Sequence, residues 1–287
     1  MPASSTLLRL EGRDALAVLQ RISTQKLDDL AAGEARVTLF CDYRGRLLHL
    51  AFVGRTEDAV WLARDDAPGA PLAEHIARHV FREDVRITDL SETHPVTPDV
   101  MGGGDIEESA RQFEARPDQA STGWITVTTG TPTRIVVESA GALDLTGRAA
   151  IPDAELRRIE TAGPRHGHEV SEEFTPFEVG LHDEVHLSKG CFTGQEVLLR
   201  LVTYGGQRRR LARVAGNEPV PAVPADLLRD GTRVGRLTSS IARGQTWIGL
   251  AVVLKEITGP EGVSVGGDAI LFGLDPVAEL RPRGLPA

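Results

Sequence analysis

Residues 189–196 read KGCFTGQE and place Cys191, one of two cysteines in the chain, between Gly190 and Gly194. A thiol reacts as its thiolate, and the neighbouring ammonium of Lys189, with N–H groups that the glycines leave open, favours that anion. Free cysteines are also among the most buried residue types, so a small core residue is the alternative. Glycine on both sides argues against the core, because it indicates that the backbone turns or closely approaches another group. This stretch, the KGC loop, therefore predicts a reactive thiol, with Cys191 and Lys189 as candidate catalytic residues.

The chain has 287 residues and a formal net charge of −9, and its length suits about two domains. Phosphate binding needs concentrated Lys and Arg, so this charge argues against an extended nucleic-acid interface. No stretch approaches the roughly 18 apolar residues that span a bilayer, and the N-terminus lacks the pattern of a secretory signal. We therefore expect a cytoplasmic protein without membrane contact, in which Cys41 and Cys191 stay thiols.

Each candidate motif for metal or nucleotide binding in the sequence lacks a residue that the motif requires. Two cysteines far apart, with no CxxC spacing, do not hold a permanent iron–sulfur cluster or a structural zinc. His182 and His186 mimic a zincin helix, but Asp183 stands where that motif needs glutamate. The glycine run 102–104 lacks the GK[ST] ending of a phosphate loop. We expect no resident metal and no nucleotide-dependent chemistry.

Hydrophobic periodicity divides the chain into an α+β part and an all-β part. Residues 12–33 predict an amphipathic helix, and the next stretch predicts an antiparallel hairpin around the turn at 42–45. Strand and helix patterns alternate from about 55 to 160, which is typical of an α+β sandwich. Within them, the polar stretch 91–121, rich in proline and glycine, predicts a long loop with little regular structure. From residue 208 onward, short β-type runs separated by Gly, Pro and Asp predict a small barrel or sandwich.

The order of several motifs resembles the YgfZ proteins. The KGC loop, followed by the glycine turn and basic strand TYGGQRRRL at 203–211, is similar to their KGC[FY]xGQE signature. These proteins belong to the superfamily of the aminomethyltransferase, or T protein, of the glycine-cleavage system. Weaker similarities follow in the same order along most of the chain: GRDALAVLQRIST (12–24), CDYRGRLLH (41–49), RRIETAGPRHGHEVSEEFTPFEVGL (157–181) and GTRVGRLTSS (231–240).

This resemblance implies an α+β fold with antiparallel sheets and flanking helices, plus a C-terminal all-β barrel. The expected folate-binding region covers 1–204 in two sub-domains, about 1–54 with 140–204 and a ferredoxin-like 55–139, and the barrel covers 205–287. YgfZ proteins assist iron–sulfur enzymes in cluster assembly or repair and affect tRNA modification through them. We therefore expect a folate-binding accessory protein that uses tetrahydrofolate or a derivative. Its expected partners are iron–sulfur enzymes or assembly proteins.

The resemblance also suggests residues that contact the folate. Glu160 matches the family glutamate at the pterin ring, where a carboxylate can accept two hydrogen bonds, and the alternative is a helix surface acid. Asp42 and Arg44 either line the pocket mouth or serve only their turn. Gln195 is expected to fix the KGC loop, and Arg200 to pair with the glutamate four residues before it if this stretch is helical. These five residues are the candidate cofactor-binding residues.

One departure separates the chain from the aminomethyltransferases. Their strand after the hairpin glycine carries an Asp pair that supports methylene transfer, and the corresponding positions here are His49 and Leu50. We therefore do not expect cleavage of an aminomethyl group. A folate-dependent one-carbon transferase or demethylase with another acid or base stays open as an alternative. A third alternative is an interaction module whose basic strand, residues 207–213, docks acidic RNA or protein.

Overall fold

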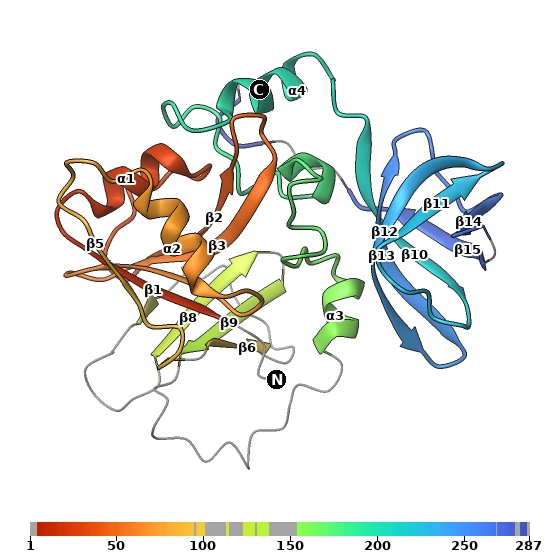
Figure 1. Cartoon of the computed structure of the whole chain (residues 1–287), viewed down its shortest axis with the longest axis horizontal. Helices are drawn as coiled ribbons and strands as arrows, with labels where there is room; N and C mark the ends of the chain where they lie inside the picture. Colours follow the sequence, from red (N-terminus) through yellow and green to blue (C-terminus); the bar gives the residue numbers. More distant parts are fainter. Residues whose placement is uncertain are drawn as a thin grey trace, which may run out of the picture.

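A computed structural model describes residues 5–94, 96–100, 113–114, 123–129, 131–137, 154–267, 269–278 and 282–285. Two antiparallel sheets occupy the N-terminal part, and a closed barrel forms the C-terminal part (Figure 1). Helices α3 (Ala154–Glu160) and α4 (Gln195–Thr203) belong to the segment that joins the two parts along the chain. This arrangement confirms the expected α+β fold with a C-terminal all-β barrel.

The first sheet has five antiparallel strands in the order β2-β3-β4-β1-β5. Its elements and the two helices beside it are β1 Thr6–Glu11, α1 Ala15–Ile22, β2 Ala35–Cys41, β3 Leu47–Arg55, β4 Val60–Arg64, α2 Gly69–Ala77 and β5 Arg86–Asp89. One apolar core combines Leu8 of β1 with Leu19 of α1 and Leu72 of α2, so both helices cover the same face. The helix predicted within 12–33 and the hairpin around the turn at 42–45 are both present.

The opposite face of this sheet meets a second sheet of four antiparallel strands in the order β6-β9-β8-β7. Its strands are β6 Val96–Val100, β7 Phe113–Glu114, β8 Gly123–Thr129 and β9 Thr131–Val137. Leu7, Trp61 and Val96 share a core between the sheets. Leu7 and Leu8 enter different cores because successive strand residues point to opposite faces.

Two expectations from the sequence are corrected here. The stretch 91–121 contains β6 and β7, because backbone pairing with β9 and β8 orders strands that carry few apolar side chains. Residues 95, 101–112 and 115–121 of it lie outside the described part. The first sheet also continues across residue 55, where a sub-domain boundary was expected, because β3 and β4 pair antiparallel. Residues 55–139 therefore do not make a separate ferredoxin-like sheet, since β4 and β5 belong to the first sheet.

The C-terminal barrel closes in the order β10-β13-β12-β11-β14-β15. Its strands are β10 Arg209–Asn217, β11 Ala225–Arg229, β12 Thr232–Arg243, β13 Thr246–Leu254, β14 Val263–Val265 and β15 Ala269–Pro276. Trp247 is fully buried in its core, and the indole Nε1 donates to the carbonyl of Asn217 at 3.0 Å. Gly216 makes room for the ring, because a Cβ there would stand 2.6 Å from it.

A third core joins the first sheet to the barrel. It includes Leu47 of β3, Phe177 of the 3-10 helix η2 (Pro176–Val179), Leu198 of α4 and Leu250 of β13. Apolar contacts therefore hold the segment after α3 between the two halves. Within the described ranges, no helix is both long enough and apolar enough to cross a membrane.

Buried hydrogen bonds tie the end of α1 to the segment that leads into the KGC loop. Thr24 Oγ1 donates to the carbonyl of Glu184 at 2.7 Å and accepts the amide of Leu39 at 3.1 Å. The carbonyl of Thr24 accepts the amide of His186 at 3.0 Å. Because Thr24 is buried, water cannot replace these partners, and losing one leaves a polar group unsatisfied.

We predict that Thr24→Val lowers the free energy of unfolding by about 1–3 kcal/mol, because a methyl group replaces the hydroxyl and removes its hydrogen bonds to a carbonyl and to a buried amide. Urea denaturation of the purified protein measures this loss. Thr203→Val, at the exposed end of α4, is the control and should stay within about 0.5 kcal/mol of the wild type. Equal stability of both variants would show that the Thr24 hydroxyl contributes nothing.

Candidate functional site

Reciprocal contacts fix the KGC loop to the C-terminal end of α1. Lys189 Nζ donates to the carbonyl of Ser23 at 2.7 Å and also to that of Gln20. Gln20 Nε2 in turn donates to the carbonyl of Lys189 at 2.9 Å. The ammonium thus meets carbonyl groups at a helix end, where positive charge is favourable, while burial lowers the pKa of Lys189 to about 7. Lys189 anchors the loop, which the sequence analysis did not foresee, and its activation of the thiol stays a prediction.

The two cysteines differ in exposure. Cys191 is exposed, whereas Cys41 is buried at the end of β2, where burial raises the pKa of its thiol far above the usual range. Gly190 and Gly194 on either side of Cys191 have φ of 102° and 82°, a left-handed backbone that favours glycine. Cys41 is therefore the core cysteine, whereas Cys191 is accessible to a reagent or a partner.

The turn between β2 and β3 lies directly against the KGC loop. Asp42 Oδ1 accepts the amides of Arg44 and Arg46, both at 2.8 Å, a contact typical of tight turns. The carbonyl of Asp42 would lie 2.6 Å from a Cβ at Gly194, so this close approach requires glycine. Arg44 is exposed and stacks on the ring of Tyr43. Asp42 therefore serves its turn, and the contact of either residue with a folate stays a prediction.

Helix α4 begins where the KGC loop ends. Gln195 Nε2 donates to the carbonyl of Leu187 at 2.8 Å, which fixes the loop as predicted. Arg200 pairs with Glu196 on the exposed side of the helix, which confirms the expected i,i+4 ion pair. Phe192 is buried and packs in the third core. These contacts are structural, and the binding of folate by Gln195 or Arg200 stays a prediction.

Glu160 lies at the exposed end of α3 beside the barrel. Its carboxylate pairs with Arg243 of β12 at 3.3 Å, and its carbonyl accepts Arg213 Nε at 2.9 Å. In Figure 1, α3 lies well apart from α4, which follows the KGC loop. The structure therefore does not bring Glu160 together with Cys191. The contacts of Glu160 within the described residues are those of an acidic residue on a helix surface.

The basic strand 207–213 is largely engaged within the chain. Three guanidinium groups are held by carboxylates or carbonyls: Arg209 by Glu178 (2.8 Å), Arg210 by the carbonyl of Lys255 (3.0 Å) and Arg213 by Asp275 (2.9 Å). Arg208 is exposed. Because three of the four arginines already have partners, this strand does not favour the alternative of docking acidic RNA or protein.

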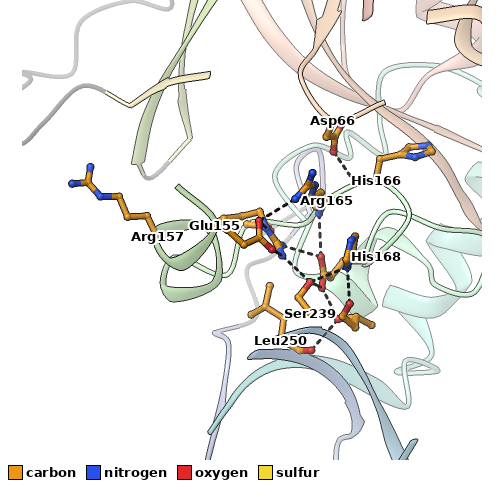
Figure 2. A network of polar contacts seen from close by, with 12 residues as sticks. Asp66, Glu155, Arg157, Arg165, His166, His168, Ser239 and Leu250 are labelled. Atoms are coloured by element: carbon orange, nitrogen blue, oxygen red, sulfur yellow. Dashed lines mark hydrogen bonds and ion pairs between the residues drawn. The ribbon is translucent and has the colours of Figure 1, made fainter. Parts of the chain in front are cut away.

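A buried carboxylate links the segment after α3 to the barrel, and Figure 2 labels two of its partners, Arg165 and Ser239. Glu169 has no exposed surface and accepts Arg158 Nη1 at 3.1 Å and the amide of Arg165 at 3.1 Å. From β12 it accepts Ser239 Oγ at 2.7 Å and Thr238 Oγ1. The carboxylate is therefore fully paired, as a buried charge requires.

Glu155 extends this network toward the first sheet. Arg158 donates to both of its carboxylate oxygens, at 2.6 and 2.9 Å, and Arg165 Nη1 donates at 3.1 Å. Although burial opposes it, hydrogen bonding and the charge of Arg158 lower the pKa of Glu155. In Figure 2, Arg157 points away from the network. Glu155 and Arg158 thus lie on the face of α3 that enters this network, and the contact of Glu160 with a folate stays a prediction.

A second cluster lies where β3 and β4 meet the segment after α3. Arg64 is buried at the end of β4, and its Nη1 atom lies 3.2 Å from the Nδ1 atom of His49 on β3. The ring of His49 stacks on that of His166, with 5.9 Å between centroids and 8° between planes. Asp66 Oδ2 accepts the amide of His166 at 2.7 Å, a contact drawn in Figure 2. His166 follows Arg165, so the two clusters are continuous.

Burial perturbs several titratable groups of this second cluster. It lowers the pKa of His49 to about 3, with the charge of Arg64 adding to the effect, and lowers the pKa of His75 to about 4. It raises the pKa of Asp65 to about 6, with the charge of Asp66 adding. Neutral imidazoles beside a carboxyl that keeps its proton to a higher pH mark a candidate binding site, because solvated surface groups do not behave this way.

The second cluster contains both hydrogen-bond donors and hydrogen-bond acceptors. Asp65 and Asp66 supply acceptors, Arg165 and the imidazole of His49 supply donors, and a pterin ring has both kinds of edge. The imidazole His75 Nε2 is buried and has no hydrogen-bond partner in the described part of the chain. Among the same residues, no group of three or more His, Cys, Asp or Glu side chains could hold a metal ion.

Sequence reasoning missed this cluster because its members come from three separate segments. The doublet Asp65-Asp66 directly follows a buried strand, and Arg165 and His166 lie about 100 residues further along the chain. The one available signal was His49, because the resemblance to the aminomethyltransferases implies an Asp at this position.

Comparisons with known proteins agree with this architecture, although no family model matches the sequence. A chloroplastic protein of Arabidopsis thaliana, named as a transferase without a stated substrate, is 26% identical over 91% of this chain and 66% of its own length. A mitochondrial iron–sulfur cluster assembly factor IBA57 homolog of Cryptococcus neoformans is 26% identical over 83% of this chain and 70% of its own length. The chain thus spans about two thirds of the length of these relatives.

Aminomethyltransferases match in both sequence and structure. The aminomethyltransferase of Staphylococcus carnosus is 22% identical over 97% of this chain and 81% of its own length. The crystal structure of the glycine cleavage system aminomethyltransferase T from Bartonella henselae superimposes with a TM-score of 0.73 and 16% identity, covering 98% of this chain and 86% of that one. This likeness shows the fold. The sequence matches to an aminomethyltransferase and to an IBA57 homolog agree with this fold and support the resemblance of the chain to the aminomethyltransferase superfamily.

Proposed function

We propose that this chain is a cytoplasmic, folate-binding accessory protein that supports the assembly or repair of iron–sulfur enzymes and, through them, tRNA modification. The observation that carries the proposal is the exposed thiol of Cys191 on a loop that is fixed at both ends. Lys189 fixes one end by donating to a carbonyl after α1, and Gln195 fixes the other by donating to the carbonyl of Leu187. A thiol that meets an iron site on a partner must be accessible and held in a defined position. A relative named as an iron–sulfur cluster assembly factor supports the same role.

The cofactor in this proposal is tetrahydrofolate or a derivative. The aminomethyltransferase-like fold supports folate binding in general, and the second cluster offers the donors and acceptors that a pterin needs. Asp65, Asp66 and Arg165 would hold the ring, and the stacked pair of His49 and His166 would lie beside it. Bound folate would supply one-carbon chemistry, while these residues bind and orient it.

An enzyme of one-carbon transfer is the second candidate, because relatives are named as aminomethyltransferases. The residues of the second cluster do not favour it. His49 and Leu50 replace the Asp pair, and His49 is held neutral next to Arg64. Another acid, such as Asp65, would have to take over the chemistry.

We predict that a thiol reagent distinguishes the two cysteines in the folded protein. Cys191 should react within the mixing time of an ordinary disulfide-exchange assay. Cys41 should react only when urea unfolds the chain, because it is buried and burial raises the pKa of its thiol. Counting the protein thiols that react in Cys191→Ser and in Cys41→Ala shows which cysteine gives the fast phase. A fast phase that survives in Cys191→Ser would contradict the proposal.

We also predict that Cys191→Ser abolishes function while leaving the fold intact. Complementation of a strain that lacks its own YgfZ-type protein, read out as the activity of an iron–sulfur enzyme, measures function, and circular dichroism measures folding. Cys41→Ala is the matched control and should complement, because its thiol is inaccessible. Full complementation by Cys191→Ser would remove the sulfur from the mechanism.

Reduced folate should bind saturably and quench tryptophan fluorescence, with Arg165→Gln weakening the affinity about 3- to 30-fold because a charge-assisted hydrogen bond is lost. Arg229→Gln, which removes a guanidinium from β11 of the barrel, is the control and should bind as the wild type does. Incubation with methylenetetrahydrofolate and candidate amines then decides between the two functions. Binding without turnover supports the accessory role, and turnover supports the enzyme.

A further inference from the structure

The contact between Arg64 and His49 determines which nitrogen of the imidazole carries the proton. A guanidinium group only donates hydrogen bonds, so His49 Nδ1, 3.2 Å from Arg64 Nη1, must be the acceptor. The proton of the neutral ring then sits on Nε2. Arg64 cannot easily turn away, because it is buried and also donates to Thr6 Oγ1 at 2.9 Å and to the carbonyl of Pro68 at 2.8 Å.

The surroundings keep this imidazole neutral. The titratable groups that act on His49 are Arg64 from β4, His75 from α2 and His166 from the segment after α3, and each of them is a base. A second proton on the ring would place two cations in contact inside a half-buried site. Asp66 is engaged with the amide of His166. His49 is therefore a fixed hydrogen-bond donor and not a group that exchanges protons near neutral pH.

The donor atom itself is free to meet a ligand. The only hydrogen-bond contact of the His49 ring within the described residues is the one to Arg64, through Nδ1. Its face is covered by His166 at 5.9 Å, which leaves the Nε2–H at the ring edge. A half-buried donor needs water or a ligand as its partner.

We propose that His49 Nε2–H recognises the one-carbon group of the folate, and that this group is a formyl group whose oxygen accepts the hydrogen bond. This inference rests on the proposed folate-binding function and deepens it by naming the ligand class. Methyl and methylene groups on a reduced folate offer no oxygen acceptor, whereas a formyl group does. A carboxylate at this position would attract a cationic amine, but a neutral N–H beside Arg64 does not.

Binding experiments test the ligand class directly. Titration of the full chain with 5-formyltetrahydrofolate and with tetrahydrofolate should show a roughly 3- to 10-fold preference for the formyl compound, the usual effect of one neutral hydrogen bond. The preference should disappear in His49→Leu and persist in His94→Leu, which alters a histidine outside the cluster. Equal affinities in the wild type, or a preference that survives in His49→Leu, would overturn the inference. Failure of both folates to bind would overturn the proposed function as well.

A second measurement needs no folate and so separates the two claims. Nitrogen-15 spectra of the histidines should show His49 with its proton on Nε2 and without titration between pH 5 and 8. In Arg64→Gln, checked for folding by circular dichroism, the titration of His49 should move up toward the usual range for histidine. A proton on Nδ1, or titration of His49 near pH 6.5 in the wild type, would show that Arg64 does not hold the ring as inferred.

Discussion

The buried carboxylate of Glu169 is the polar contact that fixes the segment after α3 to the barrel, in addition to the apolar core that joins the two halves of the molecule. An isolated charge in this position would cost several kcal/mol. A guanidinium group, a backbone amide and two hydroxyl groups offset that cost here. Arg158 also donates to both carboxylate oxygens of Glu155. The guanidinium that binds Glu169 therefore also sets the position of α3. The polar site next to α3 is therefore shaped by a structural ion pair.

The KGC loop is built on the same principle, in which buried polar groups present an exposed one. The ammonium of Lys189 and the amide of Gln20 bond to each other's backbone carbonyls, and Thr24 holds the segment just before the loop. Ordering a glycine-rich loop costs conformational entropy, and these contacts offset it. Cys191 thus gains a defined position although it is exposed.

Features that depend on local pattern could be predicted from the sequence, and those that depend on distant partners could not. The helix α1, the turn at Asp42, the short strands of the C-terminal part and the pair of Arg200 with the preceding glutamate all follow from patterns over a few residues. Lys189 contacts carbonyls 166 and 169 positions away, which no local pattern encodes. The place of Glu155 in the buried network likewise depends on the packing of α3 against β12, whereas the contact of Glu160 with a folate stays a prediction. The contact of Arg64 with His49 could be predicted only with the register of β3 against β4.

The unequal exposure of the two sulfurs has a consequence for oxidative stress. Peroxide would convert accessible Cys191 to a sulfenic acid, and Cys41 is sealed inside the fold and cannot serve as a resolving cysteine. No internal disulfide can then protect the oxidised residue. Its reversible fate is a mixed disulfide with glutathione or with a partner, so its recovery would depend on the cellular thiol pool.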